Sequence, residues 1–259
     1  MNKIEKIIFS IQSTKDFQDE SLALSILERI NSTPFVPDIY AFSEPLRFKY
    51  EVEDLSAPVR IWMHQEVNRN LAIYNQASGS LMMKSKSEDR VFYNFNWDKL
   101  KVNPRFNIMQ FSVGSNYLMQ DNNFERFLWL CKELIKIIEP VYGNITRTGE
   151  PNWKEAINVK IRLPEIRWLN IYGKPYVEMF GKEKLLSTPC HKAKAITEEI
   201  ISVQASESLF QVIDDNVKNN IKNHLGKDAF VWDNKSVWGY KEGKVPNFDF
   251  SGVLYDIES

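Results

Sequence analysis

The chain has 259 residues, a formal net charge of −1 from 33 basic and 34 acidic side chains, and 43% hydrophobic residues. Phosphate-directed nucleic-acid binding needs a surplus of Lys and Arg, so the balanced charge argues against a nucleic-acid partner. No uncharged apolar run approaches the ~20 residues that a membrane-spanning helix requires. Two cysteines are too few for a disulfide framework, and residues 1–17 lack the continuous apolar stretch of a secretion signal. We therefore expect a cytoplasmic globular protein with no membrane partner.

The N-terminal part predicts one helix followed by several strands. Residues 19–31 place apolar side chains on one helical face. Alternation of apolar and polar residues predicts strands at 58–74, 91–97 and 106–113.

A long amphipathic helix is predicted from residue 122 to residue 139. Its apolar stripe includes Cys131, where a free cysteine acts as a small buried hydrophobe. Asn122 and Glu125 have the spacing of a capping box, and Pro140 is expected to end the helix.

Residues 143–153 are polar and contain two glycines and a proline, which is typical of a boundary. We therefore predict an N-terminal half, residues 1–145, and a C-terminal half, residues 146–259. The two halves either form separate domains or a single domain, and no residue-level repeat relates them.

The C-terminal half predicts short strands and helices. Expected strands are 157–163, 166–172, 195–204 and 229–232. Expected helices are 175–186, broken at Gly181, and 214–225, ended by Gly226; the tail 239–259 reads as irregular.

Strands that follow one another in sequence favour hairpins. The predicted fold class is therefore α+β, with antiparallel or mixed sheets covered by helices.

Motifs that announce a cofactor or a metal are missing from the sequence. There is no GxxxxGK[ST], GxGxxG, HExxH or CxxC pattern, and His64, His191 and His224 lack metal-ligand spacing. We expect no cofactor and no metal.

Candidate catalytic pairs are equally weak. Cys190 and His191 are chain neighbours, as are Glu198 and Glu199, and adjacent residues on a strand point to opposite faces. Asp214 and Asp215 are explained by the dipole of the helix that they begin. No catalytic residue is predicted.

The most distinctive text is residues 163–189, LPEIRWLNIYGKPYVEMFGKEKLLSTP. We interpret it as a strand, a turn and a short helix. The structural residues of this motif are expected to be Trp168, Asn170, Gly173, Pro175 and Gly181.

Tyr172 and Tyr176 lie in the same segment and admit two interpretations. They either pack in the core or form an aromatic surface that binds a protein partner, since Tyr is enriched at interface hot spots. The same alternative applies to the aromatic content as a whole, which is 13%.

The segment resembles the pattern LPxIxWLNxxGxxYVxxxGxxKLLxxP of uncharacterised bacterial proteins and of immunity proteins from polymorphic toxin systems. It is similar to the immunity protein 52 group. The resemblance covers about 27 residues and carries over no catalytic residue.

The resemblance implies an immunity protein that binds a cognate toxin stoichiometrically in the cytoplasm and is not an enzyme. Two alternatives stay open. One is a hydrolase-like enzyme with a dispersed active site, and the other is a structural or phage-derived interaction protein.

Overall fold

The computed structural model describes residues 5–67, 76–87, 90–151, 153–155, 157–232 and 237–254. Contacts divide the chain into unit 1, Met1–Glu139 with Asp249–Ser259, and unit 2, Pro140–Phe248. The predicted boundary between residues 145 and 146 differs from this division, because it would place residues 249–259 in the C-terminal half. Whether the halves form separate domains or a single domain stays open.

Unit 1 is built on an antiparallel sheet. Its strands are β1 (Lys6–Ser13), β2 (Ile39–Ala41), β3 (Phe48–Lys49), β4 (Glu66–Val67), β5 (Gln76–Lys84), β6 (Val91–Leu100) and β7 (Asn107–Gly114). The order is β1-β7-β6-β5-β2-β3, with β4 also paired to β5. Buried and partly exposed side chains alternate along β1 and β6 because successive residues face opposite sides of a sheet.

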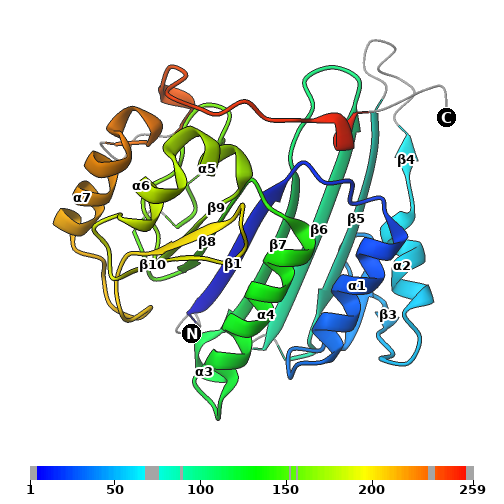
Figure 1. The fold of residues 1–259 in the computed structure, drawn as a ribbon. Coiled ribbons are helices and arrows are strands. Elements are labelled where there is room, and N and C mark those ends of the chain that lie inside the picture. The colour runs from blue at the N-terminus through cyan, green and yellow to red at the C-terminus, as the bar shows by residue number, and fades with distance from the viewer. Residues whose placement is uncertain are drawn as a thin grey trace. The chain divides into compact units, whose positions relative to one another are not determined.

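Helices cover one face of this sheet (Figure 1). They are α1 (Glu20–Asn31), α2 (Ser56–Met63) and α4 (Asn123–Ile138), with the single turn α3 (Ser115–Leu118) before α4. Asp19 caps α1 by accepting a hydrogen bond from Leu22 N at 3.0 Å. Aromatic rings fill the core beneath, and Tyr93 stacks on Phe111 with centroids 4.4 Å apart.

The strands of unit 2 are also antiparallel and are shorter than most strands of unit 1. They are β8 (Tyr142–Arg147), β9 (Leu169–Tyr172), β10 (Lys192–Ala195) and β11 (Ile201–Gln204), in the order β10-β11-β9-β8. The helices are α5 (Lys174–Phe180), α6 (Lys182–Leu186) and α7 (Asp215–Leu225). Short 3₁₀ turns are η1 (Lys227–Ala229) and η2 (Val237–Gly239) in unit 2, and η3 (Ser251–Val253) in unit 1.

The α+β fold class is confirmed. The helices predicted at 19–31, 122–139 and 214–225 are present, as are the strands at 91–97 and 106–113. The break at Gly181 separates α5 from α6.

The strand predicted from residue 58 is wrong, because residues 56–63 form α2. The buried residues of α2 are Pro58, Val59 and Trp62, and the three positions between Val59 and Trp62 are a helical spacing. Pro58 lies in the first turn of α2, where proline is tolerated. Residues Glu66–Val67 of the same prediction do form a strand, β4, and residues 68–74 lie outside the described residues.

The ends of α4 lie within one residue of the predicted ends, but the predicted capping box does not form. Asn122 precedes the helix, but its side chain makes no capping hydrogen bond. At the other end Glu139 takes a left-handed conformation, with φ of 51°, so the helix stops before Pro140.

Three predictions in unit 2 also need correction. The polar boundary at 143–153 begins with β8, whose residues are mostly buried. Residues 157–163 form turns, with Ile161 N and Arg162 N both donating to Asn158 O. Residues 192–204 form a hairpin, closed by Ile196 N donating to Ile200 O at 2.8 Å.

The last strand, predicted at 229–232, is reduced to an isolated bridge between Phe230 and Leu163. Across the described ranges, no helix is both long and apolar enough to cross a membrane.

Candidate functional site

Glycine is required at the turn between β9 and α5. An ideal Cβ on Gly173 would lie 1.8 Å from the carbonyl oxygen of Pro140. Gly173 N donates to Val141 O at 3.0 Å, so the two backbones meet there. Pro175 follows in the first turn of α5, and Gly181 joins α5 to α6 with φ of 91°.

Asn170 fastens β9 to its neighbours through its amide. Its Nδ2 donates to Arg167 O at 2.8 Å and to Val203 O at 3.4 Å, and its Oδ1 accepts from Arg167 N at 3.1 Å. Asn170 and Trp168 are both buried. Trp168 and Asn170 therefore stabilise the interior of unit 2 and do not form part of its surface.

Tyr172 and Tyr176 are also fully buried. Their ring centroids lie 6.1 Å apart, and each contacts Phe180 at 5.9 Å. Burial raises the pKa of both hydroxyl groups. Neither ring presents an aromatic surface, so a surface that binds a partner must be built from other residues.

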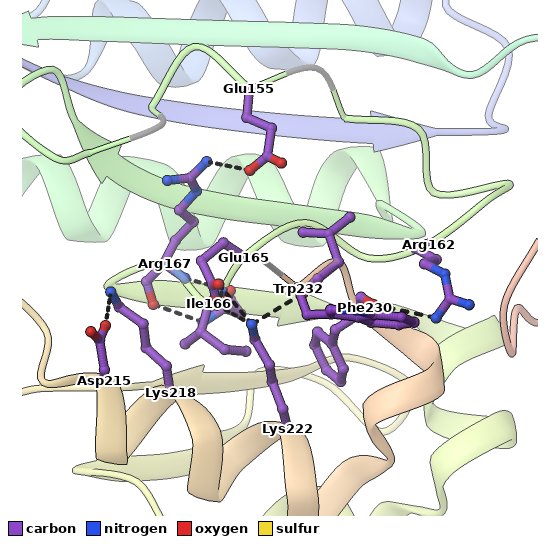
Figure 2. Close-up of polar contacts among 12 residues, drawn as sticks. Glu155, Arg162, Glu165, Ile166, Arg167, Asp215, Lys218, Lys222, Phe230 and Trp232 are labelled. Carbon is purple, nitrogen blue, oxygen red and sulfur yellow. Dashed lines mark hydrogen bonds and ion pairs between the residues drawn. The ribbon is translucent and has the colours of Figure 1, made fainter. Parts of the chain in front are cut away.

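A buried guanidinium organises the residues before β9. The Arg167 side chain is 3% exposed, and its Nη1 and Nη2 lie 3.9 Å from Glu150 Oε2 and Glu155 Oε2, respectively. Thr146 Oγ1 donates to the same Glu150 oxygen at 2.7 Å. Burial raises the pKa of the Glu155 carboxyl, and the charge of Arg167 partly offsets this. Figure 2 shows Glu155 pointing at Arg167.

A second buried cation fixes α7. Lys222 Nζ lies 2.6 Å from Glu165 Oε1 and 2.7 Å from Glu165 Oε2, and it donates to Val231 O at 3.1 Å (Figure 2). Because Glu165 lies just before β9, this ammonium joins the helix, the sheet and the segment after η1.

A third buried cation, Arg162, has no carboxylate within ion-pair distance among the described residues. Its Nε donates to Lys241 O at 3.2 Å, and its Nη1 donates to the carbonyls of Asp228 and Phe230. The guanidinium carbon lies 4.5 Å from the ring centroid of Trp232 and 5.4 Å from that of Tyr240.

Trp232 forms the wall of a pocket of about 480 Å³, which we call the Trp232 pocket. The indole is 41% exposed, and Trp232 N donates to Tyr240 Oη at 2.8 Å. The pocket is lined by Asn219, Lys222, Lys227, Asp228 and Trp232. Its volume lies in the range typical of binding pockets, and its lining residues come from α7 and the segment just after it.

Unit 1 has a larger hollow of about 710 Å³, the Trp129 groove. It is lined by Asn31, Ser32, Thr33, Pro34, Glu125, Arg126 and Trp129. Trp129 is 42% exposed on α4. Its neighbours Glu125 and Arg126 carry opposite charges.

The candidate catalytic pairs, Cys190–His191 and Glu198–Glu199, are not among the residues that line the Trp232 pocket or the Trp129 groove. Burial raises the pKa of the Cys190 thiol, the opposite of what a nucleophilic thiolate needs. His224 Nε2 lies 2.8 Å from Lys184 O, and His64 packs against Phe42. Over the described ranges, no group of His, Cys, Asp or Glu could hold a metal ion.

The Trp232 pocket and the Arg162 side chain that stacks on its wall were missed from sequence. Arg162, Lys222 and Trp232 come from three segments whose order carries no motif. The one usable indication was Lys218 and Lys222 one helical turn apart on α7, together with an exposed Trp soon after the helix.

The fold that this site belongs to is α+β with antiparallel sheets and covering helices. No protein-family model matches the chain. No curated protein matches it either.

A solved structure described as "Pseudomonas aeruginosa T6SS protein PA0821" is similar to it, with a TM-score of 0.54 and 13% sequence identity. The match covers 97% of this chain and 77% of that one. At this identity the likeness shows a shared fold, and membership of the immunity protein 52 group stays a prediction.

Proposed function

We propose that the chain is an immunity protein that neutralises a cognate bacterial toxin by direct stoichiometric binding in the cytoplasm. The observation that carries the proposal is the placement of large aromatic side chains at the surface. Trp129, Trp232 and Trp238 are 42%, 41% and 67% exposed, respectively. Trp is the residue most enriched at interface hot spots, and two of these rings line hollows that a partner could fill.

Two further observations support the proposal. The 163–189 segment resembles that of immunity proteins, and its residues are used for folding, as expected of a family signature that is not an active site. The shared fold with a T6SS protein is compatible with a role in a bacterial toxin system.

An immunity protein that blocks its toxin by stoichiometric binding needs no catalytic groups. It needs a complementary surface of roughly 800 Å² on each partner, which a chain of this size can provide. The absence of cofactor motifs in the sequence fits a protein that acts by covering its target.

The test is co-expression with the toxin domain encoded by the adjacent gene. We expect cells to survive, and the two proteins to co-elute as a complex of one copy each in size-exclusion chromatography with light scattering. If the toxin still kills and no complex forms, the proposal is wrong.

A titration of the purified proteins separates blocking from the hydrolase alternative. A stoichiometric inhibitor abolishes toxin activity only as the molar ratio approaches one. An enzyme that destroys the toxin or its product would protect at about one hundredth of that ratio, because each molecule turns over repeatedly.

A further inference from the structure

Among the residues that the structure describes, Arg162 brings an unpaired positive charge next to the Trp232 pocket, because its guanidinium stacks on the Trp232 ring that lines the pocket. Arg162 is buried, and its hydrogen bonds within the described ranges all go to backbone carbonyls. Lys222 is already neutralised by Glu165 at 2.6 Å. A buried cation without a carboxylate favours the approach of an anion, since its charge is only partly compensated by carbonyl dipoles.

The rim of the pocket adds one charge of each sign. Lys227 and Asp228 are both exposed, and in the part of the chain that the structure describes neither side chain makes an ion pair. Among the described lining residues and Arg162, the charged groups without an ion-pair partner are two cations, Arg162 and Lys227, and one carboxylate, Asp228. The Trp129 groove has no such excess, because Glu125 and Arg126 balance each other.

The pocket is also preorganised. The Trp232 ring stacks on Arg162, and the backbone N of Trp232 donates to Tyr240 Oη. Lys222 is held by Glu165 and Val231 O, and Figure 2 shows Lys222 pointing at Glu165. Side chains already fixed in their bound positions lose little conformational entropy on association. A rigid aromatic wall beside a positive field fits a side chain with an apolar stem and a carboxylate end.

We propose that the Trp232 pocket is the toxin-binding contact of unit 2 and accepts an Asp or Glu side chain from an acidic surface of the toxin. This rests on the proposed function. The stem of the acidic side chain packs on the Trp232 ring, and its carboxylate lies near Lys227 in the field of Arg162. Asp228 opposes the same carboxylate and limits affinity.

The experiment measures the affinity of the purified toxin domain for single variants by isothermal titration calorimetry. Lys227→Glu should weaken binding about 10-fold, and Asp228→Asn should strengthen it about 3-fold, since close charge pairs at interfaces contribute on this scale. Trp232→Ala should weaken binding by about 30-fold, the lower limit for a hot spot. Higher salt should weaken wild-type binding and reduce the difference between the charge variants.

Lys192→Glu is the matched control, since Lys192 is an exposed lysine on β10 and the change in charge is the same. It should bind as the wild type does. Because Trp232 also stacks on Arg162, the folding of the Trp232→Ala variant is checked by circular dichroism. If this variant unfolds, the affinities of Lys227→Glu and Asp228→Asn test the pocket assignment.

The outcomes separate the two proposals. If the wild type binds the toxin domain and both charge variants bind as Lys192→Glu does, the pocket assignment is overturned while the immunity function stands. If Lys227→Glu strengthens binding, the partner surface is basic and the assignment is also overturned. If the wild type does not bind, the proposed function itself fails.

Discussion

The interior of unit 1 is filled by aromatic and aliphatic side chains, whereas unit 2 buries charge. All the buried charged residues of the described ranges belong to unit 2: Glu150, Arg162, Arg167 and Lys222. In unit 1 the buried polar residues are serines and asparagines. Apolar contacts are non-directional, while ion pairs and hydrogen bonds fix side-chain orientation. The comparison suggests that unit 1 supplies bulk stability and that unit 2 holds the Trp232 pocket in a defined geometry.

The largest effect is expected in the core of unit 1. Phe111→Ala should lower the free energy of unfolding by about 4 kcal/mol, because it leaves a cavity beneath the stacked Tyr93 ring. Urea denaturation followed by circular dichroism measures this. Phe111→Leu, which keeps most of the volume, should cost about 1 kcal/mol. Equal losses for the two variants would contradict an interior held by packing.

In unit 2 a comparable loss should come from charge. Arg167→Ala should destabilise by about 3 kcal/mol, since it leaves two carboxylates near a buried position without their cation. Lys218→Ala breaks the surface pair with Asp215, which is 2.9 Å long, and should leave the free energy of unfolding nearly unchanged, because exposed ion pairs contribute little. A loss below about 1 kcal/mol for Arg167→Ala would show that the network does not stabilise unit 2.

The two glycines of the 163–189 segment should differ. Gly173→Ala places a Cβ against Pro140 O and should cost about 2 kcal/mol by displacing backbone. Gly181→Ala meets nothing within 4 Å and should cost about 1 kcal/mol through its positive φ alone. Thermal melting of both variants measures the order, and the reverse order would contradict the close-approach argument.

The smallest effect concerns pH. The folded-state pKa of Glu155 is raised above its ordinary value of 4.5, so its favourable contribution is present below that value and is lost as pH rises through the folded-state pKa. Glu155→Gln does not titrate. The melting temperature of this variant should therefore rise relative to the wild type between about pH 4 and pH 7.

Glu198→Gln is the control of opposite sign. Lys182 lowers the pKa of Glu198, so that carboxylate stabilises the fold above its unfolded-state pKa and loses this contribution as pH falls. The melting temperature of Glu198→Gln should fall relative to the wild type as pH rises towards about 4.5, because the lowered folded-state pKa places this change below the unfolded-state value. If the melting temperature of Glu155→Gln falls relative to the wild type as pH rises, as expected for Glu198→Gln, burial does not raise the pKa of Glu155.

Local patterns predicted the long elements of this fold well. The stripe of α4 and the stop at Gly226 are local properties, and both appear as expected. Residues 56–63 were misread because Val59, Ile61 and Met63 alternate as in a strand, although Val59 and Trp62 are what the core buries. Short apolar runs fit both periods, and tertiary packing decides between them.

The candidate site could not be predicted in the same way. Glu165 and Lys222, whose charged atoms lie 2.6 Å apart, are 57 positions apart in the sequence. Arg162 meets Trp232 only after residues 157–163 form turns, where a strand was expected. A charged residue in a polar stretch of sequence is expected to be exposed, and the neighbouring residues do not show that the fold will bury it.

The chain leaves unit 1 at Glu139 and returns to it at Asp249. The returning segment is fixed there, with Phe250 packed on Phe106 at 4.9 Å and Leu254 bridged to Leu100. Unit 2 is therefore an insertion held at both of its ends. A single proteolytic cut inside unit 2 would therefore leave each of the two fragments with a segment that belongs to unit 1.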